Sequence, residues 1–263
     1  MEEVRNIKNF EKYIKNKLDG VTGKYGFYFK DLTTGDSLGL NENELFQAAS
    51  IIKLPILAVT AKLIDAGELS FDTEILVKDS EKVPSCGAIR FFRGDIKVEV
   101  DTLCKTMITI SDNTSTNAMM RTIGLGRMNR EFISLGMEKS HCERLLFDSS
   151  SAAKGKQNRI TPYEMGMLLE KIYRHTLVSE EMSRYMEDIL LDQQINHKIP
   201  GYLPEDIEVG HKTGEDSEVT NDVGIVYTKK PFVICFMFND ADVPQAERAI
   251  REISLALASE WNK

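Results

Sequence analysis

A serine and a lysine three residues apart, Ser50 and Lys53, stand at the head of an apolar run that ends near Gly67. On an α-helix this spacing places both side chains on one face, about one turn apart. A lysine in a poorly hydrated site near a second cation loses its proton more easily than it does in water. It can then accept the proton of the serine hydroxyl and leave a nucleophile. The pair therefore indicates covalent catalysis by a serine.

The same spacing recurs at Ser151 and Lys154, so the first pair needs support from elsewhere in the chain. A match to Ser-x-x-Lys is expected roughly once by chance in a chain of this length. The second pair lies in a polar stretch of small residues without an apolar helix behind it. We interpret this second pair as solvated loop.

Two polar tripeptides follow Ser50 along the chain. Ser111-Asp112-Asn113 lies between two segments with helical periodicity, which places its polar groups at an inter-helix turn. Lys212-Thr213-Gly214 ends a predicted strand, directly after His211. Each tripeptide alone would be interpreted as a helix cap or a strand end. Their order and spacing behind Ser50 are hard to produce by chance.

The composition is that of an ordinary globular chain, because 263 residues with 42% hydrophobic content can hold one large core or two modest ones. A formal net charge of −8 argues against a nucleic-acid-binding protein, which usually presents a basic stripe. No stretch approaches the roughly 18 apolar residues of a transmembrane helix. The first residues, Met1–Arg5, lack the apolar core of a secretion signal. Either the protein stays inside the cell or a signal preceded this chain.

The cysteines and histidines predict neither a disulfide framework nor a metal site. The four cysteines are widely separated and show no Cys-x-x-Cys spacing. Cys104 and Cys235 lie in apolar runs and are expected to be buried thiols, whereas Cys86 is expected to be exposed. The four histidines are too dispersed for a metal motif. We expect no cofactor.

Hydrophobic periodicity places strands at the two ends of the chain and helices between them. The predicted strands cover 25–32, 37–45, 207–213, 219–227 and 232–239. The predicted helices cover 3–19, 50–66, 100–110, 113–123, 127–135, segments opening at Thr161-Pro162 and Ser179, and 244–261, with little strand between 67 and 190. This order implies a discontinuous α/β domain formed by 1–46 and 192–263, and a helical domain formed by 47–191.

The three motifs, at 50–53, 111–113 and 212–214, resemble the signature set of class A β-lactamases and penicillin-binding proteins. The segments 85–87, 98–117 and 198–204 are also similar to the corresponding class A stretches, so the resemblance covers nearly the whole chain. It implies an α/β plus all-α fold of the β-lactamase/transpeptidase type. In this fold an antiparallel sheet is flanked by helices, a helical domain is inserted, and the active site lies in the cleft between them.

The resemblance also implies catalytic roles. Ser50 would attack a lactam or peptide carbonyl and form an acyl-enzyme. Lys53 would be the base, or would orient a water that is, and Ser111 would pass a proton to the departing nitrogen. The oxyanion would lie between the backbone N–H groups of Ser50 and Glu215.

Substrate binding would fall to the remaining motif residues. By the same resemblance, Asn113 would donate its amide to the side chain of the substrate. Lys212 would attract the substrate carboxylate and lower the proton affinity of Lys53. Thr213 would hydrogen-bond that carboxylate, and Gly214 completes the motif.

The chain departs from the class A pattern at two places. Class A enzymes carry a deacylating glutamate in the loop before the Thr-Pro helix, but aligning Arg144 with the loop arginine of the family puts Leu146 or Leu145 there. Glu143 and Asp148 are the nearest acids, and each is either a deacylating group or a surface charge or cap. Glu215-Asp216 replaces small neutral residues and puts negative charge beside a site meant for an anionic substrate.

These departures predict slow penicillin hydrolysis and leave the acylation chemistry in place. The leading hypothesis is a class A-like serine β-lactamase that hydrolyses cyclic amides. The alternatives are a D,D-peptidase or penicillin-binding relative, a sensor that is acylated once, and an esterase of the same fold. We expect a monomer that binds a β-lactam or peptidoglycan-like small molecule and no nucleic acid. The resemblance implies an extracytoplasmic or secreted protein.

Overall fold

The computed structural model describes residues 7–263, and its centre is a five-stranded antiparallel sheet with the spatial order β2-β1-β9-β8-β7. The strands are β1 (Lys24–Asp31), β2 (Ser37–Leu40), β7 (Val209–Asp216), β8 (Val219–Val226) and β9 (Phe232–Asn239). Strands from the two ends of the chain pair with each other, with Lys24 opposite Asn239 and Asp31 opposite Phe232. The predicted antiparallel sheet flanked by helices is confirmed.

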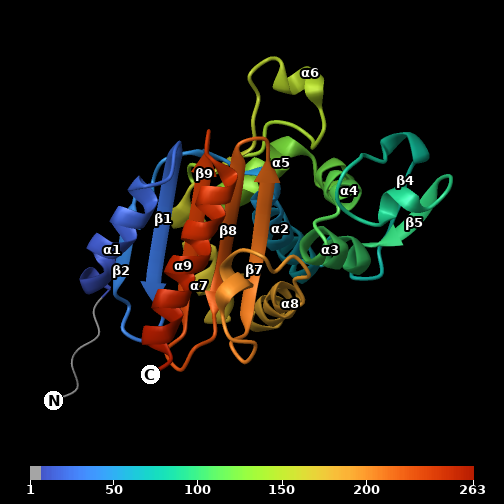
Figure 1. Ribbon diagram of the computed structural model, residues 1–263. Helices are drawn as coiled ribbons and strands as arrows, with labels where there is room; N and C mark the ends of the chain where they lie inside the picture. Colours follow the sequence, from blue (N-terminus) through green and yellow to red (C-terminus); the bar gives the residue numbers. More distant parts are fainter. Residues whose placement is uncertain (1–6) are drawn as a thin grey trace.

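Two helices from the chain ends, α1 (Lys8–Asp19) and α9 (Val243–Trp261), cover one face of the sheet (Figure 1). Phe27 and Phe29 point to this face because successive side chains of a strand alternate between its two faces. Trp261 packs edge-on against Phe29, with ring centroids 5.0 Å apart, and its indole N–H donates to Asp31 Oδ2 at 2.7 Å. The last turn of α9 is thereby anchored to β1.

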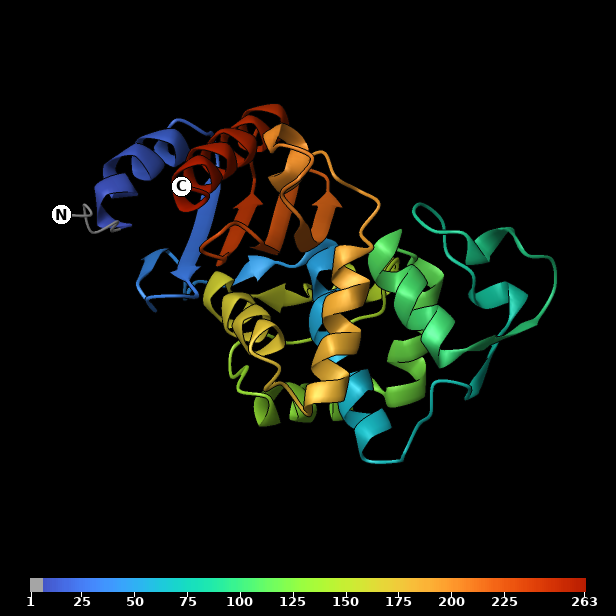
Figure 2. The same cartoon turned by 90° about the horizontal axis from the view of Figure 1, so that it is seen from below.

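The other face of the sheet packs against the helices of the chain's middle (Figure 2). The middle of the chain contains α2 (Lys53–Asp65), α3 (Val100–Thr109), α4 (Asn113–Ile123), α5 (Leu125–Ser134), α6 (Ser149–Ala152), α7 (Pro162–Tyr173) and α8 (Glu180–Leu191), with short 3₁₀ turns η1 (Ala49–Ile52), η2 (Asp79–Glu81), η3 (Ile89–Phe91) and η4 (Ile199–Tyr202). Of these helices, α7 and α8 lie directly against the strands, whereas α6 projects away from the sheet (Figure 1). In α2, every residue from Lys53 to Ala61 is buried. A helix that is apolar on all sides lies inside a core, and α2 carries the Lys53 end of the first motif into it.

Between 67 and 190, where the sequence predicted little strand, the structure has three short strands, β4 (Glu74–Val77), β5 (Ile96–Glu99) and β6 (Arg159–Ile160). β4 pairs with β5, and β3 (Phe46–Gln47) pairs with β6. These strands have two to four residues each, too few for an alternating pattern to stand out. The hairpin of β4 and β5 projects away from the sheet beside α3 and α4 (Figure 1).

Several other boundaries move. The returning strand predicted over 37–45 ends at Leu40, and the strand predicted to end at Thr213 continues to Asp216. The helix predicted over 3–19 begins at Lys8, and residues 3–6 of that prediction lie outside the described part of the chain. Cys86 is exposed and Cys104 and Cys235 are buried, as predicted. In the described range 7–263, no helix combines the length and the hydropathy that crossing a bilayer requires.

Candidate active site

Lys53 begins α2 with a side chain that is fully buried. Its Nζ lies 2.9 Å from Ser50 Oγ, 2.9 Å from Ser111 Oγ, 2.8 Å from the Ser111 carbonyl oxygen and 2.8 Å from Asn113 Oδ1. Burial, followed by the charge of Lys212, holds the pKa of Lys53 well below its ordinary value. The amine is therefore disposed to be neutral beside the Ser50 hydroxyl.

Ser50 lies in the 3₁₀ turn η1 and not in the α-helix that the sequence predicted. The spacing still works, because residues three apart eclipse each other on a 3₁₀ helix. Ala49, directly before Ser50, has a φ of 44°, in the left-handed region that residues with a Cβ rarely adopt. Such strain persists only where the surroundings over-determine the backbone. The turn places Ser50 at the wall of a cleft.

Ser111 lies at the turn between α3 and α4, as predicted, and is a second residue with left-handed backbone, at a φ of 54°. The following Asp112 caps α4 and also accepts hydrogen bonds from the N–H groups of Ala88 and Ile89, at 2.7 and 2.9 Å. Gly87 has a φ of 107°, and a Cβ on it would lie 2.2 Å from the Asp112 carboxylate. Asp112 thus fixes the loop around Cys86 against the turn that carries Ser111.

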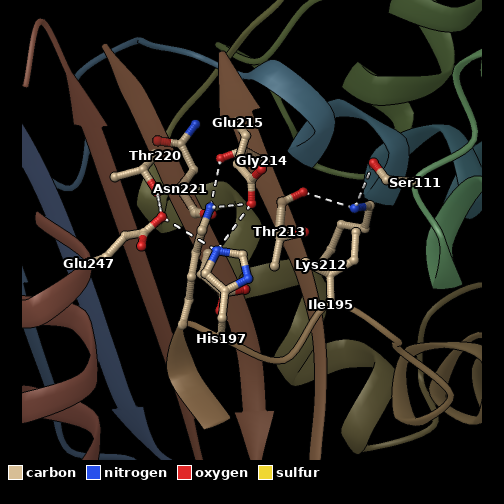
Figure 3. Close-up of polar contacts among 12 residues, drawn as sticks. Ser111, Ile195, His197, Lys212, Thr213, Gly214, Glu215, Thr220, Asn221 and Glu247 are labelled. Carbon is tan, nitrogen blue, oxygen red and sulfur yellow. Dashed lines mark hydrogen bonds and ion pairs between the residues drawn. The ribbon is translucent and has the colours of Figure 1, made fainter. Parts of the chain in front are cut away.

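Lys212 reaches the same place from the sheet (Figure 3). It lies within β7, fully buried, and its Nζ donates to Ser111 Oγ at 3.2 Å and to the Thr213 carbonyl at 2.8 Å. Burial lowers the pKa of Lys212 to about 7. Behind it, the His211 ring bonds the buried Asp222 carboxylate at 2.9 Å. Three distant motifs therefore meet around Lys53 and Ser111.

Gly214 allows β7 to approach η1 closely. A Cβ on this residue would lie 2.9 Å from Ile51 Cγ1 and 3.0 Å from the Ala48 carbonyl oxygen. Contacts this short do not occur without displacement of the neighbours, so only glycine fits at this separation. The cleft next to this contact has a volume of about 580 Å³ and is lined by Ser50, Ser111, Asn113, Thr213 and Glu215, among others.

The sequence left Leu145 and Leu146 as candidates for the position of the class A glutamate, and the structure places Leu146 in the cleft. Leu146 lines the cleft, and its backbone is held on both sides by Asn117. The Asn117 amide donates to the Leu146 carbonyl at 2.9 Å and accepts from the Leu146 N–H at 2.8 Å. Sequence reasoning gave Asn117 no role, although it lies four residues after Asn113 on one helix face.

The two acids nearest to this leucine hold the loop together. Asp148 Oδ1 accepts from the N–H of Ser151 at 2.9 Å and caps α6, and the hydrogen bonds from Ser151 lower the pKa of Asp148. Glu143 Oε2 accepts from the Gln157 N–H at 2.9 Å. Asp148 is thus the N-cap of α6, one of the roles that the sequence allowed for it. Lys154, of the second Ser-x-x-Lys match, is exposed.

A third buried lysine was not assigned a role from the sequence. Lys198 is fully buried beside η4, and its Nζ lies 3.1 Å from the Gly214 carbonyl, 3.2 Å from the Asn221 carbonyl and 3.2 Å from Glu215 Oε1. No local pattern singles out this lysine, because its partners come from β7 and β8. It lies directly behind the third motif.

The sheet, the inserted helices and the three motifs around one cleft define the class of β-lactamases and penicillin-binding proteins. A family model described as the β-lactamase enzyme family matches residues 9–261. The chain therefore belongs to the β-lactamase enzyme family, and the resemblance inferred from the motifs is confirmed.

Individual relatives agree with this assignment. β-Lactamase BRO-1 of Moraxella catarrhalis is 28% identical over 205 residues, which cover 73% of this chain and 63% of BRO-1. The chain thus spans less than two thirds of that relative. The structure of PBP-A is similar with a TM-score of 0.89 and 25% identity over 97% of both chains. A β-lactamase from Sphaerobacter thermophilus has a TM-score of 0.86 and 27% identity over 97% of this chain and 98% of that one.

Proposed function

We propose that the protein is a class A-like serine β-lactamase in which Ser50 forms an acyl-enzyme with β-lactams and releases it slowly. The observation that carries this proposal is the contact of 2.9 Å between Ser50 Oγ and the fully buried Nζ of Lys53. A neutral amine at that distance is within reach of the hydroxyl proton, which is the first requirement for a general base.

Acylation follows from this arrangement. Lys53 accepts the proton of Ser50 as Oγ bonds to the lactam carbonyl carbon, and the developing oxyanion is stabilised by the N–H groups of Ser50 and Glu215. The C–N bond of the ring then breaks. Ser111 Oγ, 2.9 Å from Lys53 Nζ and 3.2 Å from Lys212 Nζ, gives its proton to the ring nitrogen and regains one from Lys53. Lys53 is neutral again when the acyl-enzyme is complete.

Ligand binding uses the groups around this centre. Asn113, whose Oδ1 is held by Lys53, has an amide at the cleft wall that can donate to an acylamino side chain. Lys212 attracts the carboxylate of a β-lactam while it is charged, and the Thr213 hydroxyl hydrogen-bonds that carboxylate. These roles rest on the resemblance to class A enzymes and on the position of the residues in one cleft.

Slow release is supported by Leu146. Hydrolysis of an acyl-enzyme needs a group that takes a proton from the attacking water. Leu146 cannot do so, and the carboxylates of Asp148 and Glu143 are engaged by the N–H groups of the loop. A leucine-to-glutamate variant of PBP-A, solved as an acyl-enzyme complex with penicillin G, has a TM-score of 0.88 and 25% identity to this chain. That protein is therefore a precedent for acylation in this fold.

The same leucine favours a second candidate, a D,D-peptidase that acts on the stem peptides of peptidoglycan. Such an enzyme needs the acylation machinery around Ser50 and Lys53 but gains nothing from fast hydrolysis of a penicillin. The likeness to PBP-A, at 25% identity over 97% of both chains, supports this candidate. A simple esterase remains the outcome of the test when neither β-lactams nor peptides react.

One experiment separates these functions. The protein is mixed with a chromogenic cephalosporin and with a fluorescent penicillin, and product release is followed together with intact mass. Steady, slow hydrolysis with a transient adduct on the peptide that contains Ser50 supports the β-lactamase. A stable adduct without turnover supports the D,D-peptidase, which is then tested with a D-Ala-D-Ala peptide. Absence of any adduct, with cleavage of a simple ester, would refute both.

The pH dependence of acylation is expected to report Lys212. Because burial lowers the pKa of Lys212 to about 7, its ammonium loses its charge as the pH rises through this value. The rate constant for acylation by benzylpenicillin below saturation should therefore fall above pH 7, since this constant reports groups of the free enzyme. Lys53 does not cause the fall, because a base gains activity on losing its proton. The methyl ester of benzylpenicillin is the control, and identical profiles for acid and ester would contradict the role of Lys212.

Gly214→Ala is expected to slow acylation about tenfold, because a methyl group would push β7 away from the turn that carries Ser50 and misplacement of reacting groups is costly. The measurement is the rate of labelling by a fluorescent penicillin. Gly210→Ala on the same strand is the matched control, since its Cβ would meet nothing closer than 3.5 Å. Equal effects of the two substitutions would show that the contact with η1 does not matter.

A further inference from the structure

The carboxylate of Glu215 is paired with a buried cation at the edge of the cleft. Glu215 follows the third motif on β7, and its Oε1 lies 3.2 Å from Lys198 Nζ and 3.4 Å from His197 Nε2 (Figure 3). The Lys198 side chain is fully buried, whereas that of Glu215 is 50% exposed and lines the cleft. One oxygen of Glu215 is thus held by a cation while the side chain faces the space for a ligand.

Lys198 has one negative partner in the described part of the chain. Its other acceptors are the carbonyl oxygens of Gly214 and Asn221, which carry only partial charge. An ammonium group removed from water is costly unless an anion compensates it. Glu215 supplies that anion, next to Thr213 and on the side of β7 where the proposed function puts the carboxylate of a substrate.

The charged residues in the rest of the cleft also disfavour an anionic ligand. Its acidic lining residues are Asp148, Glu215 and Asp216, and its basic one is Arg144. The Arg144 guanidinium already donates hydrogen bonds to Gln157 Oε1 and to the Leu145 carbonyl oxygen. Lys212 is buried and near the midpoint of its titration at neutral pH. An anionic ligand therefore meets a wall with more exposed negative than positive charge.

We propose that Glu215 is a specificity-determining residue. Its carboxylate pairs with Lys198 beside Thr213 and fills the place in which that cation would otherwise attract the carboxylate of a ligand. The cleft therefore favours ligands with a neutral group at this place over ligands with a carboxylate. This inference rests on the proposed function, because it concerns the ligand that acylates Ser50. Glu215 weakens the attraction that Lys212 exerts on an anionic ligand, both by its charge and by engaging the neighbouring cation.

The test compares two ligands that differ only in this charge, benzylpenicillin and its methyl ester. Rate constants for the adduct on Ser50 are measured by quenched intact mass in the wild type and in Glu215→Gln. The amide keeps an oxygen for Lys198 but carries no negative charge, and the melting temperature of each variant is recorded to verify that the fold is retained. The ratio of the rate constants, acid over ester, is expected to rise about tenfold, the effect of a partly desolvated charge contact.

Asp216→Asn is the matched control. Asp216 is the adjacent acid of the cleft, but it accepts a hydrogen bond from Gln47 Nε2 at 2.9 Å and makes no ion pair with Lys198. Its substitution should change the ratio by less than about threefold, as for an ordinary surface charge. An unchanged ratio in Glu215→Gln, or an equal rise in both variants, would overturn the inference and leave the proposed function standing. Absence of an adduct with either ligand in every variant would overturn both.

Discussion

Replacing Lys53 by methionine is expected to slow the acylation of Ser50 by β-lactams about 10³-fold, the range that a positioned general base contributes. Methionine keeps most of the length of the buried side chain, but its thioether sulfur is too weak a base to accept the serine proton. Nζ of Lys53 contacts both hydroxyls of the site, at 2.9 Å from Ser50 Oγ and from Ser111 Oγ. Its loss therefore interrupts proton transfer to the nucleophile and to the leaving nitrogen together.

The measurement is the rate of labelling by a fluorescent penicillin, with the melting temperature recorded in parallel. Ser50→Ala should give no adduct at all. Lys62→Met is the matched control, since Lys62 lies on the same helix but pairs with Glu131 at 2.7 Å, away from the cleft. A rate within about tenfold of the wild type in Lys53→Met would exclude Lys53 as the main base. An adduct that persists in Ser50→Ala would exclude the assigned nucleophile.

The central contacts of the site could be predicted because each motif is short. Ser50 and Lys53 meet whether the backbone is α-helical or 3₁₀, since both helices bring residues three apart together. Ser111 was placed at an inter-helix turn on periodicity alone, and the structure has it there. The sheet followed from β-branched and aromatic strands at both ends of the chain. Each of these signals spans only a few neighbouring residues, and the meeting of the three motifs in one cleft was implied by the resemblance to class A enzymes.

What the sequence did not predict depends on partners far along the chain. β7 continues past Thr213 because Glu215 pairs with Thr220 and Asp216 with Val219 of β8. The residue types of β7 alone do not predict this extension. Lys198 has its acceptors on two different strands. Burial of a lysine behind a motif is a property of packing, and periodicity carries no information on it.

The loop from Glu143 to Asn158 shows the same limit. Two leucines were equal candidates for the cleft, and the choice is made by side chains outside their own segment. Asn117 on α4 fixes the backbone of Leu146 from both sides, and Asn158 accepts from the N–H groups of Glu143 and Arg144 at 2.9 and 3.1 Å. These hydrogen bonds fix the backbone of Leu146 at the wall of the cleft.

Leu146→Glu is therefore expected to accelerate release of the acyl-enzyme by about 10²-fold or more, the contribution of a positioned general base. The new carboxylate would start from a backbone already held by Asn117, at the wall of the cleft that contains Ser50. Leu146 is only partly buried, so the substitution does not open a closed core. The variant should turn over a chromogenic cephalosporin faster, with a shorter-lived adduct and little change in the acylation rate.

Leu145→Glu is the matched control, because Leu145 is the adjacent leucine but does not line the cleft. It should leave the lifetime of the adduct nearly unchanged. Acceleration in both variants would mean that added negative charge, and not a base at one position, speeds release. No acceleration in Leu146→Glu, with the fold intact by melting temperature, would mean that the wild-type chain already has a deacylating group. In that case slow hydrolysis would have another cause, and Glu215, whose negative charge lies at the edge of the cleft, would be the next residue to test.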